Sequence, residues 1–241
     1  MGLSLGLGVT SSSNVLEDLS FRADPATHPK IKAFYKFKSL GGSDITAVTS
    51  WDDQTGNFAL EQADNDEKPS YTASTGAVNF HGGDDNLESA TSFSLPSNFI
   101  IGIRMNVDAT INNDVAIGSN KEAGNFIRIK QSNKITLRYG NGAVTDHTLN
   151  SGTTISDATT FNLIVSRNAG GISKIFFNGT EQTSTKTEST VSTFVLDTLG
   201  VRRTDTNDLD GAIFEVQVYD GVDFDETGFI SSLNSHLNSL S

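Results

Sequence analysis

The sequence of 241 residues contains no cysteine, which excludes disulfides, thiolate nucleophiles and cysteine-ligated metal sites. It has only one tryptophan and four tyrosines, so there is little aromatic surface for stacking on sugar rings. Lysine and arginine number 17 against 29 acidic residues, and the formal net charge of -12 opposes binding to nucleic-acid phosphates. No apolar run approaches the roughly 20 residues needed to cross a bilayer, so a soluble protein without a membrane partner is expected.

Apolar residues make up 36% of the chain and include 15 phenylalanines, enough for a sizeable core. All-β sandwiches of this length commonly form a single domain. Short segments rich in β-branched and aromatic residues recur between turn-forming residues, whereas helical patterns are few. This arrangement predicts an antiparallel sandwich or barrel. The predicted strands span residues 76–80, 99–107, 115–117, 126–130, 134–139, 161–166 and 173–177.

The strand predicted over residues 211–219 has the clearest alternation. It places Phe214, Val216 and Val218 on one continuously apolar face and Glu215 on the other. This pattern is typical of a strand that closes a sandwich.

Two shorter signals add detail to the sandwich. The pair Asn178-Gly179 separates two apolar segments and predicts a two-residue β-hairpin turn, because both residues tolerate positive φ. The single tryptophan, Trp51, stands among polar turn formers and is expected to lie in the core rather than to serve as a platform for sugars.

Only the end of the chain has a helical pattern. Asp223 with Glu226 three residues later matches a capping box, and apolar residues follow at helical spacing. A helix over residues 223–241 is therefore predicted to pack one apolar stripe on the sandwich. His236 lies among serines and asparagines and is expected to face solvent.

The first 10 residues alternate leucine with glycine and serine, without the basic start and long apolar run of an export signal. We expect residues 1–29 to form an extended docking arm, followed by the sandwich over residues 30–222. Such an arm can add a strand to a neighbour or place apolar side chains in its grooves. Its expected anchors are Leu3, Leu5, Leu7 and Val9.

Five segments, in order, resemble the concanavalin A-like or laminin-G-like jelly-roll superfamily over about residues 33–235. They are residues 33–37 with 51–57, 77–88, 99–107, 161–167 with 175–179, and 211–219. His81 stands where the family's turn usually has an acidic residue. The resemblance implies an all-β, two-sheet antiparallel jelly-roll sandwich. It does not imply one function, because this fold carries lectins, glycosidases, adhesins and structural modules.

Catalytic patterns are incomplete in this sequence. Glycosidases that the chain resembles carry paired acids in the order Glu-x-Asp-x-x-Glu, and here Gln217 occupies the middle position between Glu215 and Asp220. A literal G-x-S-x-G match at residues 2–6 has no preceding strand. The four histidines are dispersed and form no zinc motif. A protein without enzymatic activity is therefore expected.

The acidic loops are candidates for a site that binds a metal ion or another ligand. Many relatives on this fold bind calcium at loops that join the sheets, so the resemblance makes four residues candidates for calcium or another ligand, with solvated turns as the alternative. The required ligand spacing of an EF-hand is absent around Gly211. No other cofactor is expected. The four candidates are Asp84, Asp85, Asp208 and Asp210.

A docking arm, a displayed jelly roll and an acidic surface together resemble a bacteriophage virion protein. The first hypothesis is a non-enzymatic protein that decorates the capsid. It would be made in the host cytoplasm, bind the major capsid protein or another virion protein through its arm, and form a symmetric array or homo-oligomer on the virion surface. The alternatives are a tail- or fibre-associated host adhesin, a lectin-like carbohydrate-binding module with a glycan partner, and a divergent glycosidase.

Overall fold

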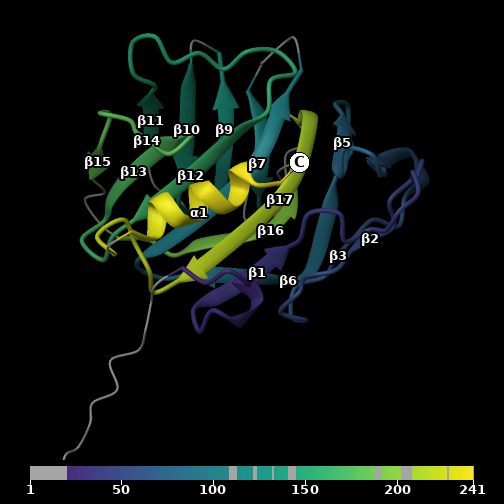
Figure 1. Ribbon diagram of the computed structural model, residues 1–241, viewed down its shortest axis with the longest axis horizontal. Helices are drawn as coiled ribbons and strands as arrows, with labels where there is room; N and C mark the ends of the chain where they lie inside the picture. The colour runs from purple at the N-terminus through teal and green to yellow at the C-terminus, as the bar shows by residue number, and fades with distance from the viewer. Residues whose placement is uncertain are drawn as a thin grey trace, which may run out of the picture.

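Two antiparallel sheets packed face to face form the body of the protein (Figure 1). The structure is a computed structural model and describes residues 21–108, 113–121, 124–131, 133–140, 145–187, 191–201, 208–226 and 228–240. Sheet A contains β1 (Ile31–Tyr35), β4 (Ser70–Thr72), β5 (Ala77–His81), β7 (Phe99–Val107), β12 (Phe161–Arg167), β13 (Ile172–Phe177), β14 (Thr180–Glu181), β15 (Lys186–Thr187) and β17 (Asp210–Asp220). Sheet B contains β2 (Ser50–Trp51), β3 (Leu60–Glu61), β6 (Leu87–Leu95), β8 (Asp114–Gly118), β9 (Phe126–Lys130), β10 (Lys134–Arg138), β11 (Thr145–Thr148) and β16 (Phe194–Leu199).

The strand order is that of a sandwich in which neighbouring strands are distant in sequence. Sheet A runs β14-β13-β12-β7-β17-β5-β4, with β1 paired to β17 and β15 to β13. Sheet B runs β11-β10-β9-β8-β16-β6-β3-β2. Two short 3-10 helices, Pro25–Thr27 and Asn65–Glu67, and one α-helix, α1 (Phe229–Asn238), complete the elements that the described residues form. The predicted antiparallel sandwich is confirmed.

The core lies between the sheets because alternate residues of each strand point inward. The seven strands predicted from sequence are all present, as is the Asn178-Gly179 turn, in which φ is 48° and 78°. Trp51 is 1% exposed and belongs to the core, as predicted.

A β-bulge changes the predicted faces of β17. The pairing with β7 shifts between Ile213 and Glu215, so Ile213 joins Val216 and Val218 in the core. Phe214 is only half-buried and lies outside the core cluster. The predicted position of Phe214 on the apolar face is therefore wrong, because one extra residue in a bulge reverses the alternation.

Helix α1 lies across the outer face of sheet A, as predicted for the apolar stripe (Figure 1). Phe229, Leu233 and Leu237 are all fully buried there. Gly102 on β7 makes room for the helix, since a Cβ at that position would lie 2.9 Å from Cδ2 of Leu233. Among the described residues, no helix is both long and apolar enough to cross a membrane.

The start of the helix differs from the prediction. The chain enters α1 through Gly228, which has φ of 76° and forms no side-chain cap. Asp223 and Glu226 lie before the helix in a turn closed by the Glu226 amide donating to the Asp223 carbonyl at 3.1 Å. The predicted capping box is wrong, because the positive φ of Gly228 interrupts the helical path between these acids and the apolar stripe.

His236 does not face solvent, contrary to the prediction. Its side chain is 19% exposed, and its Nε2 lies 2.7 Å from Oε1 of Glu215 on β17. Glu215 is 1% exposed and also accepts from the backbone amide of Phe37 at 3.0 Å. The contact between helix and sheet explains this error, because His236 follows Leu233 at the spacing that keeps one helical face on the sheet.

The N-terminal segment meets α1 where the description begins. Phe21 packs edge-on against Phe229 with ring centroids 5.7 Å apart, and His28 packs against Tyr219 at 5.1 Å. Residues 21–28 thus adjoin the chain's own helix. The predicted arm anchors Leu3, Leu5, Leu7 and Val9 lie outside the described residues.

Candidate functional site

A polar groove crosses the outer face of sheet A, where β4, β5, β17 and β7 run side by side. We call it the sheet A groove. It has a volume of about 420 Å³. Its lining consists mainly of small or polar residues: Ser70, Thr72, Asn79, Phe80, His81, Asn106, Asp108, Gly211 and Ala212.

Small residues on β17 create the hollow. Ala212 is paired with Asn79 on one side and with Asn106 on the other, so its methyl group lies between two longer side chains. At the neighbouring Gly211 a Cβ would lie 2.4 Å from the backbone oxygen of Asn106. A glycine within a strand often marks such a close backbone approach. Gly211 and Ala212 therefore form the floor of the groove, and the two asparagines form its walls.

Internal hydrogen bonds fix the orientation of these walls. The Asn106 Oδ1 accepts from the backbone amide of Ala212 at 2.7 Å. The Asn79 Nδ2 donates to Oγ1 of Thr72 at 3.1 Å, which ties β5 to β4. Amide and hydroxyl groups can both donate and accept hydrogen bonds. The groove therefore presents preorganised polar groups of the kinds that pair with the hydroxyls of a ligand.

One end of the groove is acidic. Burial raises the pKa of the Asp108 carboxyl, and the charges of Asp210 and Asp157 raise it further, while His81 opposes the shift. The backbone amide of Asp108 donates to the carbonyl of Asp210 at 2.8 Å. Asp108 is therefore protonated more readily than an ordinary aspartate, and a protonated carboxyl can donate a hydrogen bond as well as accept one.

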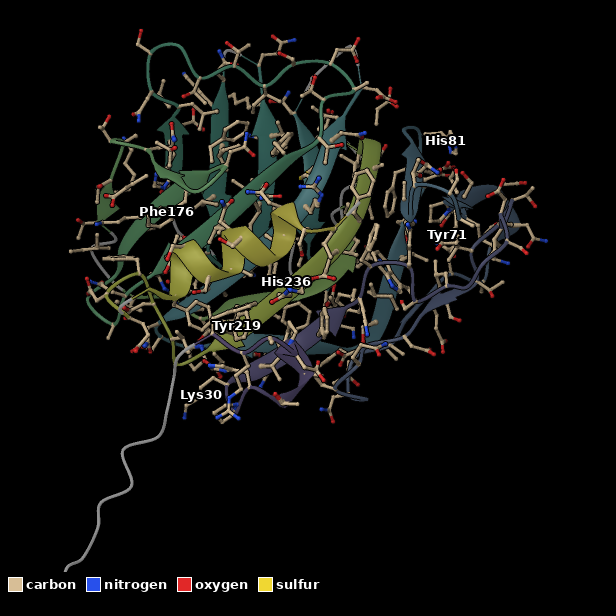
Figure 2. All side chains as sticks on the ribbon, in the orientation of Figure 1. Lys30, Tyr71, His81, Phe176, Tyr219 and His236 are labelled. Carbon is tan, nitrogen blue, oxygen red and sulfur yellow. The ribbon has the colours of Figure 1, made fainter. Side chains whose placement is uncertain are left out.

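The two acidic loops predicted from sequence meet at this end of the groove. Asp210 is paired with His81 across β17 and β5, and the amide of Gly82 donates to the carbonyl of Leu209 at 3.1 Å. His81 is the last residue of β5 and lies at the end of that strand (Figure 2). The structure therefore brings the loop before Asp210 beside the loop after His81.

The four predicted acids nevertheless have different surroundings. Asp85 is 7% exposed, and its Oδ2 lies 2.9 Å from both the backbone nitrogen and Nδ1 of His81. Asp84 is exposed, whereas Asp208 and Asp210 are half-buried. No group of three or more His, Asp or Glu residues suited to a metal ion occurs in the described part of the chain. Calcium therefore has no support from these side chains.

Thr72, Asn79 and Asn106 were not predicted as site residues from the sequence. Asparagine is uncommon in strands, so two asparagines at outward positions of predicted strands were an available signal. Their meeting across Ala212 depends on strand order, which the sequence pattern does not give.

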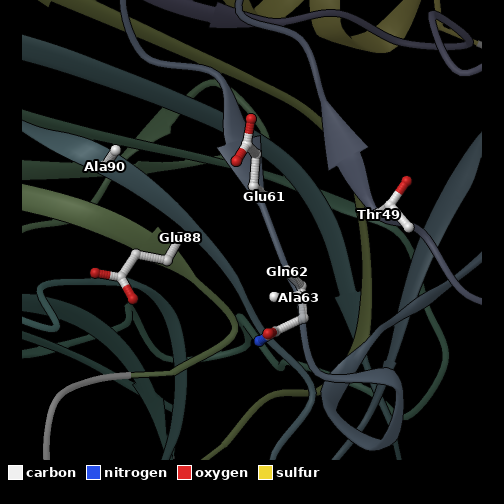
Figure 3. Close-up of a pocket in the computed structure, with 6 residues that line it drawn as sticks. All are labelled: Thr49, Glu61, Gln62, Ala63, Glu88 and Ala90. Carbon is white, nitrogen blue, oxygen red and sulfur yellow. The ribbon is translucent and has the colours of Figure 1, made fainter.

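A second cavity lies on the outer face of sheet B (Figure 3). It has a volume of about 350 Å³, and Glu61 on β3 is directly opposite Glu88 on β6. The two carboxylates point in different directions in Figure 3, and Oε2 of Glu88 accepts from Nδ2 of Asn120 at 2.7 Å. This arrangement differs from the converging nucleophile and acid of a retaining glycosidase. The lining consists of Thr49, Glu61, Gln62, Ala63, Glu88 and Ala90.

Glu215 of β17 is also separated from these cavities. Glu215 lies under α1, bound to His236, and the amide of Gln217 donates to the same carboxylate. A carboxylate buried in this way does not reach a sugar on the surface. Glu215 is therefore part of the contact between sheet and helix.

Comparisons with known proteins agree with this architecture. Residues 81–223 match the family model of the concanavalin A-like lectin/glucanases superfamily. Domain 4 of AbnA, an extracellular arabinanase of Geobacillus stearothermophilus solved with arabinotriose, is similar with a TM-score of 0.54 and 16% identity, over 86% of this chain and 98% of that one. The sialidase of Trypanosoma rangeli is similar with a TM-score of 0.56 and 12% identity, over 84% of this chain. The chain spans only 33% of that sialidase's length. A search of curated proteins found no match.

Proposed function

Because the chain belongs to the concanavalin A-like lectin/glucanase superfamily, we propose that it is a non-enzymatic carbohydrate-binding module that holds a saccharide in the sheet A groove. The fold alone carries many functions, so the proposal depends on the site. The observation that carries it is the hollow above Ala212, with Asn79 and Asn106 as oriented walls.

The groove suits recognition by hydrogen bonds more than by stacking. Phe80 contributes to the lining, but it is 1% exposed and its ring belongs to the core. Saccharide hydroxyls would pair with Asn79, Asn106 and Thr72, and the end of the ligand would meet Asp108. Without an exposed aromatic platform, we expect modest affinity, with Kd on the order of 1 mM.

The similar structures guide the choice of ligands for testing. Domain 4 of AbnA was solved with arabinotriose, and the present chain covers nearly all of that domain. Arabinotriose is therefore a reasonable first probe, followed by a panel of neutral and acidic oligosaccharides. At this low identity the likeness concerns the fold, so the panel must include other sugars.

The proposal is tested by titrating oligosaccharides into the full-length protein and following binding by saturation-transfer NMR. The double substitution Asn79→Ala and His81→Ala removes groups from the groove, whereas Asn57→Ala removes an exposed amide elsewhere. We expect binding to weaken at least about tenfold in the groove variant and to remain unchanged in the control. A ligand that binds both variants equally would contradict the assignment of the groove.

The virion-decoration hypothesis remains a prediction. It depends on the arm, and its anchors lie outside the described residues. Deleting residues 1–20 tests it: the shortened protein should stay folded but fail to join capsid shells that the full chain binds. Retained binding to shells after this deletion would remove the arm from that role.

A further inference from the structure

A half-buried arginine, Arg104, lies on the outer face of sheet A between helix α1 and the sheet A groove. The core members of β7 include Ile103, Met105 and Val107. The residues that alternate with them therefore point outward. On that outer face Gly102 lies under α1, whereas Asn106 forms a wall of the groove. Arg104 comes between these two positions, so it adjoins the groove.

Neutral amides beneath α1 hold the guanidinium of Arg104. Its Nη1 donates to Oδ1 of Asn162 on β12 at 3.0 Å. Asn162 is fully buried, and its Nδ2 donates to Oδ1 of Asn234 and to Oδ1 of Asn238, both on α1, at 2.9 Å each. A guanidinium has five N–H donors in a planar fork, and only one of them is used here. The fork is thus oriented while donors remain for a ligand.

In the described part of the chain, Arg104 forms no ion pair with a carboxylate. Glu215 is opposite Arg104 in the register, but its Oε1 lies 2.7 Å from Nε2 of His236 and its Oε2 accepts from the amide of Phe37 at 3.0 Å. Burial lowers the pKa of the Arg104 guanidinium, as expected for a cation partly withdrawn from water. Such a cation gains from a carboxylate, which can accept two parallel hydrogen bonds from the fork.

The bulge in β17 places an aromatic ring opposite Arg104. The pairing with β7 shifts between Ile213 and Glu215, and Phe214 is the extra residue. Ile213 and Val216 belong to the core, whereas Phe214 is half-buried and belongs to neither hydrophobic cluster. The ring of Phe214 therefore lies on the outer face, outside the groove lining and next to Arg104.

We propose that Arg104 and Phe214 bind a hexuronate residue of the saccharide in the groove, with its carboxylate on the guanidinium and its C–H groups on the ring. This inference rests on the proposed function, because the remaining sugar residues occupy the groove. Arg104 and Asp108 are four residues apart on β7, roughly 13 Å, a length that a trisaccharide spans. The acidic end of the groove at Asp108 disfavours a carboxylate, so the charged sugar is directed to Arg104.

NMR titration of the full-length protein with two matched probes tests this inference. Trigalacturonate carries carboxylates, whereas its methyl ester has the same sugar rings without the charge. The titration is made at about pH 7 in about 150 mM salt, which screens the repulsion of an acidic probe by the net charge of -12. The test variants are Arg104→Gln and Phe214→Ala. The control Lys134→Gln also removes one positive charge, from β10 on the other sheet.

We expect the wild type to bind trigalacturonate at least about tenfold more tightly than the ester. Arg104→Gln should remove this preference and change binding of the ester by less than about twofold, whereas Lys134→Gln should leave both affinities within about twofold. Phe214→Ala should weaken both probes, because both present the same sugar C–H groups. Equal binding of acid and ester by the wild type, or an unchanged preference in Arg104→Gln, would overturn the inference. The wild-type comparison needs no variant, so it holds even where a substitution disturbs folding.

Failure of this subsite is distinguishable from failure of the groove. Neutral sugars that bind without any preference for the acid would keep the groove and remove the role of Arg104. Absence of binding by trigalacturonate also removes that role, and the neutral oligosaccharide panel then decides separately whether the groove binds sugar.

Discussion

His147 gives a quantitative prediction for the dependence of stability on pH. This residue of β11 is fully buried. Its Nδ1 lies 2.5 Å from the carbonyl oxygen of Ser184, and its Nε2 lies 3.2 Å from Oγ of Ser173. A neutral ring satisfies both contacts, with Nδ1 donating and Nε2 accepting. Burial lowers the pKa of His147 from 6.5 to about 4, although the Ser184 carbonyl partly opposes that shift.

The sign of the effect follows from proton binding. Below its ordinary pKa of 6.5 the unfolded chain protonates this histidine, whereas the folded protein resists protonation until about pH 4. Acid therefore favours the unfolded state, and stability present above pH 6.5 is lost as the pH falls from 6.5 to the folded pKa of about 4. From these two pKa values, the loss from His147 between about pH 7 and about pH 5 is about 2 kcal/mol.

Urea unfolding of the wild type and His147→Gln at about pH 7 and about pH 5 measures this term. The carboxylates titrate in both proteins, so their contribution largely cancels in the comparison. We expect the wild type to lose about 2 kcal/mol more than the variant between these two pH values. Equal losses would refute the assignment of a depressed pKa to His147.

Three further outcomes are expected. Gly211→Ala should destabilise the protein by about 1–3 kcal/mol in urea unfolding, since its Cβ would lie 2.4 Å from the Asn106 oxygen; an unchanged midpoint would contradict this close approach. Leu233→Ala should cost about 2–5 kcal/mol, because this side chain of α1 is fully buried against sheet A, whereas exposed Ser231→Ala should change little. Calcium should leave the melting temperature unchanged, because Asp85 is engaged by His81, and a clear rise would restore the calcium hypothesis.

The strands that alternate regularly were predictable from sequence. The strand from Phe99 to Val107 was placed at its observed bounds, because β-branched residues and turn signals agree there. By contrast, β6 was missed: its segment Leu87–Leu95 is rich in serine and threonine and lacks a continuous apolar face. Pairing with β16 and β3 establishes β6 as a strand, and such pairing is not visible in a local pattern.

Errors in finer detail came from tertiary contacts. The bulge in β17 that moves Ile213 into the core depends on the match with β7, which periodicity does not reveal. His236 appeared polar in its local sequence, but Glu215 holds it beneath the surface. Among the acids beside the groove, Asp210 was predicted from the sequence as a candidate site residue. Asn79 and Asn106 were not predicted, because only strand order brings them together across Ala212.

The most direct test of the central claim is an NMR titration of the full-length protein and its Asn79→Ala, His81→Ala variant with arabinotriose and the oligosaccharide panel. The account predicts at least one ligand that binds the wild type and is weakened at least about tenfold by the double substitution. Failure of every sugar to bind, or equal binding by both proteins, would contradict the assignment of the sheet A groove as a carbohydrate site.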